Sequence, residues 1–240
     1  MSEFAAALHA AQADCVRKGI GTLGEKTLHL TLKYLFAPDP ETHERKVGGY
    51  VADAVTEEGV IEIQTRSLAR LKPKLDAFLA CCPVTVVYPV IQKKMLIRMN
   101  EAGELLAKRQ SPKHGSCWTA MRELYPLRQY MLDERFHVRL CLLDVEEYIV
   151  ESGRSKRRRV DLVPVCLHEM LSFDLPADYR ALLPDFPEPF AVPDLAAQVG
   201  AGQECARYFL SVLSSLGYVQ TCGRRGRYKL WKTVPENSRG

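Results

Sequence analysis

The chain of 240 residues lacks any apolar run of membrane-spanning length, and residues 1–15 lack the basic start and long apolar core of a signal peptide. The first absence argues against a membrane partner, and the second argues against secretion. Internal repeats and low-complexity blocks are absent too. We therefore expect a cytoplasmic protein with no membrane contact.

Paired cysteine spacing is also missing. The chain has eight cysteines, but none of them forms a C-x-x-C pair. A structural zinc site needs paired ligands of this kind, so the pattern argues against one. Without a secretory signal, the cysteines are expected to be reduced thiols.

Neither sign of charge dominates the sequence. Lys and Arg number 33 and Asp and Glu 29, which leaves a formal net charge of +4. Hydrophobic residues make up 47% and charged residues 26%, an ordinary composition for a soluble globular protein. The charge therefore permits a nucleic-acid partner without requiring one.

The spacing of apolar residues predicts helices first and strands after them. Helical spacing covers residues 3–18 and 25–37, and the period changes to two over 43–55 and 59–65, with a hairpin turn at 57–59. The later predicted elements are a helix at 67–82, strands at 84–90 and 93–100, a basic loop at 108–115, a helix at 118–132, and strands on either side of a charged turn at 153–161. Strands that alternate with helices predict the α/β class, with a mixed central sheet flanked by helices.

Five prolines between residues 176 and 193 predict a linker or domain boundary. Beyond it the pattern is helix, turn, longer helix, and two short strands around the basic tip GRRG. This order is typical of a winged helix. We therefore expect an α/β domain with N-terminal helices over residues 1–183 and a small winged-helix-like domain over residues 184–240.

Polar residues recur in the predicted hairpin YVADAVTEEGVIEIQTRS. Asp53 lies near the end of one strand, and Glu62 and Gln64 lie on its partner. Because strand side chains alternate, Glu62 and Gln64 share one face, while Ile61 and Ile63 face the core. The simpler interpretation is that these polar residues form the solvent-facing side of an ordinary half-exposed hairpin.

These residues resemble the PD-(D/E)xK nuclease superfamily in its Glu-x-Gln variant, over residues 25 to about 100. The resemblance implies a restriction-endonuclease-like core that hydrolyses phosphodiester bonds of nucleic acid, DNA by preference. Asp53 and Glu62 would bind Mg²⁺ or Mn²⁺ together with the carbonyl of Ile63. Gln64 would take the place of the usual lysine, and Glu25 on the preceding helix would complete the site.

The sequence departs from that motif in two places. Ala52 precedes Asp53 where the motif has proline, and Gln64 has no titratable proton, so it can orient water but cannot act as a base. Candidates for the missing cation are Lys46, Lys72 and Lys74. A nuclease-fold protein that binds DNA or has a regulatory or interaction role without cutting is the alternative function.

Other features that could contact nucleic acid are cationic, and each has a simpler alternative. The loop 108–116 combines cations, serines and a glycine directly before a helix start at Ser116 or Cys117, but it could equally be a solvated loop. The second helix and hairpin of the winged helix could contact DNA or another protein, including a second copy in a homodimer. The predicted nucleic-acid contacts are Lys108, Arg109, Lys113, Arg207, Arg224, Arg225 and Arg227.

Overall fold

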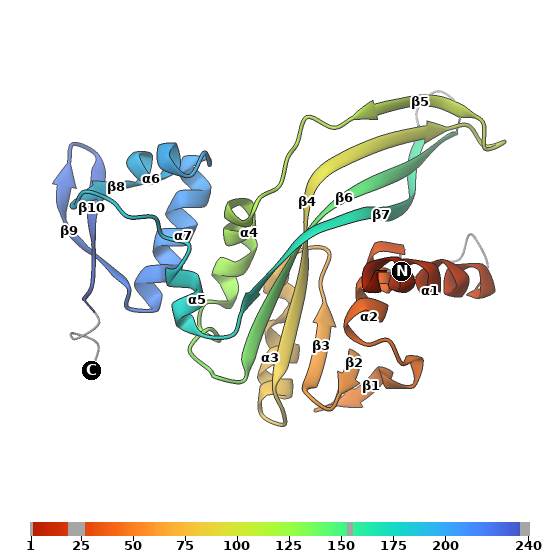
Figure 1. Cartoon of the computed structure of the whole chain (residues 1–240), viewed down its shortest axis with the longest axis horizontal. Helices are drawn as coiled ribbons and strands as arrows, with labels where there is room; N and C mark the ends of the chain where they lie inside the picture. Colours follow the sequence, from red (N-terminus) through yellow and green to blue (C-terminus); the bar gives the residue numbers. More distant parts are fainter. Residues whose placement is uncertain (1, 19–26, 153–155, 236–240) are drawn as a thin grey trace.

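The computed structural model describes residues 2–18, 27–152 and 156–235, and this part of the chain is an α/β structure built on a seven-stranded sheet (Figure 1). The strands of the sheet are β1 (His43–Val47), β2 (Tyr50–Thr56), β3 (Gly59–Ile63), β4 (Val84–Met99), β5 (Leu105–Gln110), β6 (Phe136–Ser152) and β7 (Lys156–Phe173). Their order is β1-β2-β3-β4-β6-β7, with β5 paired to β4 beside this path. β3, β4 and β6 are parallel neighbours and the other pairs are antiparallel, so the predicted α/β class with a mixed sheet is confirmed.

Helices cover both faces of the sheet because the strand side chains alternate between two apolar clusters. The helices around the sheet are α1 (Glu3–Lys18), α2 (Thr27–Phe36), α3 (Lys72–Leu79) and α4 (Cys117–Leu124). α2 packs on one face through Leu28, beside Val87 of β4. On the other face, Phe78 of α3 and Met121 of α4 pack against Val86. α1 lies against α2, away from the sheet.

The strands predicted separately at 84–90 and 93–100 are one continuous strand, β4. It pairs with β6 from Val84 to Met99, and the register shifts between Ile91 and Lys93. The break in the apolar pattern is therefore a bulge, which inserts one residue without ending the strand. The prediction of two strands was wrong because a bulge and a strand end look alike in sequence.

The prediction of a basic loop at 108–115 is also partly wrong. Lys108 and Arg109 belong to β5, which folds back on β4 with Lys108 opposite Ile97. The loop itself begins at Ser111, and α4 starts at Cys117 after it, as predicted. Pairing with a long neighbouring strand has extended β5 into residues whose own composition favours a loop.

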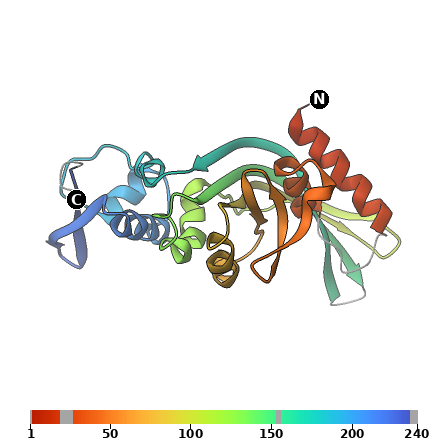
Figure 2. The ribbon, with the colours of Figure 1, turned by 90° about the horizontal axis from the view of Figure 1, so that it is seen from below.

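The C-terminal part of the chain forms a separate small sheet with helices, and it lies at the opposite end of the molecule from α1 (Figure 2). Its elements are β8 (Phe190–Ala191), α6 (Val192–Gln198), α7 (Gln203–Ser215), β9 (Val219–Arg225) and β10 (Tyr228–Thr233), with sheet order β8-β10-β9. The predicted order of helix, turn, helix and hairpin is therefore present.

Aromatic contacts dock this C-terminal part on the α/β part. Phe209 of α7 meets Trp118 of α4 edge-on with ring centroids 4.9 Å apart, and Tyr208 meets Tyr125 at 5.2 Å. Phe209 has no exposed surface and belongs to the same apolar cluster as the β4 and β6 side chains. The proline-rich segment is packed too, since Tyr179 of α5 (Pro176–Arg180) is buried in that cluster. The core is therefore continuous across the predicted boundary.

We expect Phe209→Ala to lower the free energy of unfolding by about 3 to 5 kcal/mol, the usual cost of deleting a buried phenylalanine ring. The whole chain should still unfold in one transition, because α7 shares its core with α4. Urea denaturation followed by circular dichroism measures both. Ser214→Ala, an exposed position on the same helix, should change the value by less than about 0.5 kcal/mol. An early separate transition of the C-terminal part would contradict the shared core.

Candidate active site

Asp53 and Glu62 meet where the β2–β3 ladder ends. The paired residues run from Thr56 opposite Gly59 to Ala54 opposite Ile61. Beyond that point side chains replace the ladder: Asp53 N donates to Glu62 Oε1 at 3.2 Å, and Ile63 N donates to Asp53 Oδ2 at 2.8 Å. The hairpin thus places the two carboxylates side by side, as the sequence predicted.

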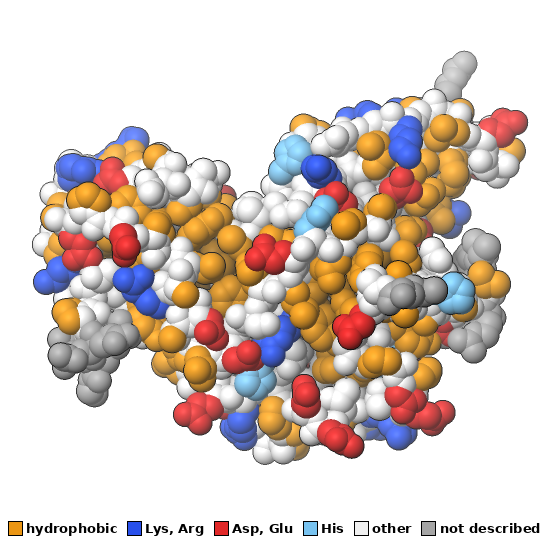
Figure 3. Space-filling model, viewed as in Figure 1, with side chains coloured by type: hydrophobic (Ala, Val, Ile, Leu, Met, Phe, Trp, Pro, Cys, Tyr) orange, Lys and Arg blue, Asp and Glu red, His pale blue; other side chains and the backbone are white. Residues whose placement is uncertain are grey.

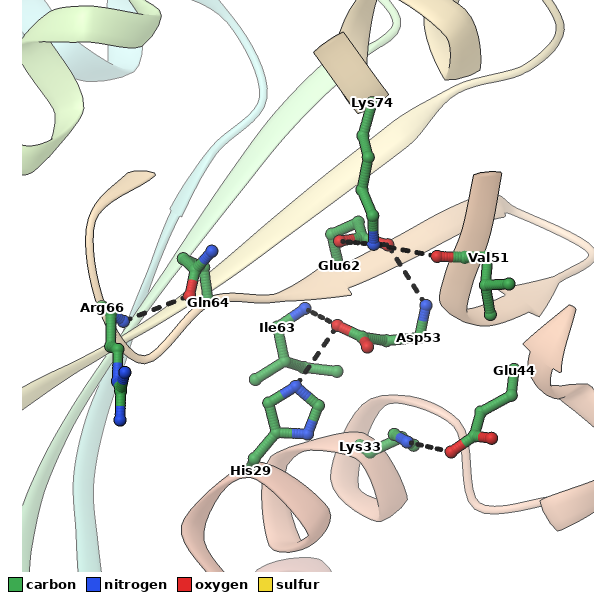
Figure 4. A network of polar contacts seen from close by, with 10 residues as sticks. All are labelled: His29, Lys33, Glu44, Val51, Asp53, Glu62, Ile63, Gln64, Arg66 and Lys74. Carbon is green, nitrogen blue, oxygen red and sulfur yellow. Dashed lines mark hydrogen bonds and ion pairs between the residues drawn. The ribbon is translucent and has the colours of Figure 1, made fainter. Parts of the chain in front are cut away.

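Lys74 of α3 reaches this pair from the helix that follows β3 (Figure 4). Its Nζ lies 3.1 Å from both Glu62 Oε1 and Glu62 Oε2, and it donates to the carbonyl of Val51 at 2.8 Å. Pro73 stands in the first turn of α3, where a missing N–H costs nothing, so Lys74 is held close to the start of the helix. Of the three lysines proposed from the sequence, Lys74 is the one that meets the carboxylates.

Glu62 is buried, with 2% of its surface exposed. Burial first, and then the nearby charge of Asp53, raise the pKa of this carboxyl from 4.5 to about 7, although Lys74 acts in the opposite direction. Desolvation and a like charge both disfavour the ionised form, and a cation favours it. The carboxylate is therefore poised to change protonation near neutral pH.

Asp53 is held from the opposite side by α2. His29 Nε2 lies 3.4 Å from Asp53 Oδ2, the same oxygen that accepts from Ile63 N. The two helices α2 and α3 thus approach the acid pair from different sides, and each contributes one nitrogen side chain.

A cleft of about 450 Å³ opens at these groups. Its lining residues are His29, Tyr50, Asp53, Glu62, Ile63, Gln64, Arg70, Leu71, Pro73 and Lys74. Tyr50 and Arg70 were missed from the sequence. Arg70 could have been expected, because the short helix η2 (Leu68–Leu71) directly follows β3 and must pass over its end.

Gln64 lines the cleft, but its hydrogen bonds are made to groups other than Asp53 and Glu62. Its backbone N–H donates to Val87 O at 3.0 Å, and its side-chain Oε1 accepts from Arg66 N at 3.3 Å. Figure 4 shows the amide pointing toward Arg66 and away from the Asp53–Glu62 pair. Glu25, the fourth predicted catalytic residue, lies outside the described residues.

The predicted nucleic-acid contacts do not line this cleft. Lys108 Nζ pairs with Glu146 at 3.2 Å, and Arg225 pairs with Asp194 at 2.5 Å. The remaining five cations, Arg109, Lys113, Arg207, Arg224 and Arg227, are exposed. Lys46 lines a different hollow beside η1 (Pro40–Thr42) and β1.

Asp53 and Glu62 are the carboxylates that line the cleft. Within residues 2–18, 27–152 and 156–235, no three His, Cys, Asp or Glu side chains form a group that could hold a metal ion. Two carboxylates, Asp53 and Glu62, remain, and such oxygen donors suit Mg²⁺, which keeps several of its waters. Both oxygens of Glu62 already accept from Lys74 Nζ at 3.1 Å.

Fold and cleft together define a class: an α/β protein whose mixed sheet carries a buried glutamate, a half-buried aspartate and a lysine at a cleft. The chain belongs to the family described as "Domain of unknown function (DUF8091)", whose sequence model matches residues 26–172. That match includes Asp53, Glu62 and Lys74.

The chain is also 33% identical, over 226 residues, to an "Uncharacterized protein" of Treponema pallidum (strain Nichols), and the alignment covers 90% of this chain and 88% of that protein. No solved structure gives a significant match. Among the helices of the described residues, none is long and apolar enough to cross a membrane.

We expect the stability of the protein to fall as the pH rises from 4.5 to 7. In that window the folded chain holds a proton on Glu62 that the unfolded chain has released, so unfolding is favoured by higher pH. The loss attributable to Glu62 is at most about 3 kcal/mol, and it levels off above pH 7. Urea denaturation at pH 4.5, 5.5, 6.5 and 8 gives the free energy of unfolding at each pH. This free energy should fall more steeply with pH in the wild type than in Glu62→Gln.

Glu57→Gln, in the exposed β2–β3 turn, serves as the comparison, because it removes an acid from the same hairpin without altering Asp53 or Glu62. It should follow the wild-type pH profile. Parallel profiles for wild type and Glu62→Gln would rule out proton uptake at Glu62.

Proposed function

We propose that this protein is a divalent-metal-dependent nuclease of PD-(D/E)xK type that hydrolyses phosphodiester bonds of nucleic acid, with DNA as the preferred substrate. One observation carries the proposal: Lys74 Nζ lies 3.1 Å from both oxygens of Glu62, beside Asp53, at a cleft. An acid pair and a cation at one strand end is the arrangement that the resemblance implies.

The order of elements supports a restriction-endonuclease-like core. α2, the β2–β3 hairpin, α3 and the parallel strand β4 follow one another in the order that the resemblance expects. The order of α6, α7, β9 and β10 likewise supports a C-terminal winged helix. Both assignments belong to the proposal.

Asp53, Glu62 and the carbonyl of Ile63 would hold the Mg²⁺ or Mn²⁺. When bound, such an ion lowers the pKa of a water and stabilises negative charge on a phosphate oxygen. The protein keeps Asp53 in place through the N–H of Ile63 and through His29. It also keeps bulk water from Glu62 by burying it.

Lys74 supplies the cation that Gln64 cannot. Its ammonium donates to Glu62 and leaves a fixed positive charge beside the reacting phosphate, where charge develops in the transition state. Arg70 in the same cleft offers a second cation for a non-bridging phosphate oxygen. The role of the motif lysine is thus moved from the strand to the following helix.

A second function is favoured by the same contact. Lys74 already satisfies both Glu62 oxygens, so the buried carboxylate is compensated without any metal. A protein of this design can bind nucleic acid in the cleft without cutting it. This second function predicts salt-sensitive binding of nucleic acid that needs no divalent ion.

Cleavage of single-stranded and duplex DNA and of RNA, each with Mg²⁺ and with Mn²⁺, tests the proposal. We expect metal-dependent cleavage by the wild type that falls at least about a hundredfold in Glu62→Ala and in Lys74→Ala, since each variant removes one of the charges that act on the phosphate. Gel analysis of end-labelled oligonucleotides measures the rates.

Lys46→Ala provides the matched control, because it removes an exposed lysine of the neighbouring strand β1 that does not line the cleft. Its rate should stay within about twofold of wild type. Absence of cleavage under every condition, or full activity in Glu62→Ala, rejects catalysis at this site. Metal-independent binding without cleavage supports the second function.

A further inference from the structure

A second hollow lies in the C-terminal part, between α7 and β10. It encloses about 390 Å³, which is within the usual range for a site that takes a small-molecule-sized group. Its lining residues are Val192, Gln203, Arg207, Ser211, Arg227, Tyr228, Lys229 and Trp231. None of them lines the cleft at Glu62, so the two sites are distinct.

One wall of this groove is a stripe of α7. Gln203, Arg207 and Ser211 recur every four residues and therefore share one helix face. The neighbouring face of α7 packs against the α/β part, where Tyr208 contacts Tyr125. Glu204 does not line the groove, whose lining residues within the described part of the chain include no acid.

The groove is cationic. Arg207 and Lys229 are exposed, and neither makes an ion pair with another described residue, whereas Arg225 of the same hairpin is paired with Asp194. Arg227 lies over the Tyr228 ring at 5.0 Å and donates to its hydroxyl at 2.8 Å. Figure 3 shows Lys and Arg side chains beside hydrophobic and acidic ones over this end of the molecule, at the left. An anionic occupant is therefore favoured.

Two aromatic residues, Tyr228 and Trp231, line the groove. Trp231 is 8% exposed, and its indole Nε1 is buried without an acceptor among the described residues. A buried N–H without a partner is unfavourable, and most such groups in folded proteins are paired. Tyr228 lies beside Trp231 in the groove and presents a second ring. A ligand with a flat face would lie against the Tyr228 ring and the exposed part of Trp231.

We propose that the groove binds a nucleotide of an unpaired nucleic-acid strand, with its base against Tyr228 and Trp231 and its phosphates against Arg207 and Lys229. Aromatic rings with interleaved cations are the usual means of holding single strands, because every base offers a π face and every linkage a charge. In a duplex both faces of each base are already stacked. The inference rests on the proposed function for its substrate, and it narrows that substrate to nucleic acid with a single-stranded portion.

The full-length Trp118→Phe variant tests the groove directly. The sequence has two tryptophans, so Trp231 becomes the single fluorophore in this variant. A single-stranded oligothymidylate of about 12 nucleotides is added in EDTA, which prevents metal-dependent cleavage. We expect quenching of Trp231, and matching affinities from the anisotropy of a labelled oligonucleotide with the wild type. Arg207→Ala and Tyr228→Ala should each weaken binding by at least about tenfold, the loss expected for one stacked base or phosphate contact.

Lys232→Ala is the control, because Lys232 is exposed on β10 and does not line the groove. It should change affinity by less than about twofold. A duplex of equal length should bind at least about tenfold more weakly than the single strand. Binding without quenching of Trp231, an equal loss in Lys232→Ala, equal affinity for duplex, or tighter binding of an oligoglutamate peptide would each overturn the proposal.

Failure of this inference is separable from failure of the proposed function. Quenching of Trp231 in EDTA reports the groove and not the cleft, because Trp231 lines the groove alone. Binding in EDTA together with no cleavage in Mg²⁺ or Mn²⁺ would retain the groove and reject the nuclease. Cleavage without binding by the groove would retain the nuclease and reject the groove.

Discussion

A carboxylate placed out of reach of water needs a cation or a proton, and Glu62 obtains one of the two from its surroundings. Lys74 supplies the cation at 3.1 Å, while burial and Asp53 together raise the pKa to about 7. The rest of the site follows from this requirement. α3 must begin close to the end of β3, and Asp53 must be held by other groups, which are His29 and the N–H of Ile63.

The remaining charges divide into those used within the fold and those directed outward. On the long strands β4, β6 and β7, buried Glu147 is flanked by Lys94 and Arg159, and Glu151 by Arg98 and Arg157. These cations satisfy acids in a sheet, so their presence alone says little about an anionic partner. Arg207 and Lys229 of the C-terminal groove make no ion pair with another described residue, and for that reason they are better evidence for an anionic partner.

Local patterns predicted much of the fold. The helix at α1, the β2–β3 hairpin and the strand beginning at Val84 all follow from periodicity that their burial bears out. The errors arose where tertiary pairing overrode composition. β4 continues past Ile91 because β6 pairs with it along its whole length, and β5 takes up Lys108 because β4 offers it an edge. A single sequence does not contain that information in its local pattern.

For the candidate site, the sequence by itself determined the acid pair. Asp53 and Glu62 stand on two strands joined by a short turn, and hairpin geometry brings such positions together with little freedom. Only the tertiary structure decided which cation joins them. Lys46, Lys72 and Lys74 are equally suitable in sequence, and the choice depends on how α3 packs against the sheet. That packing is set by Leu75 and Phe78, which are buried among side chains distant in the chain, so it arises from the whole core and not from the motif.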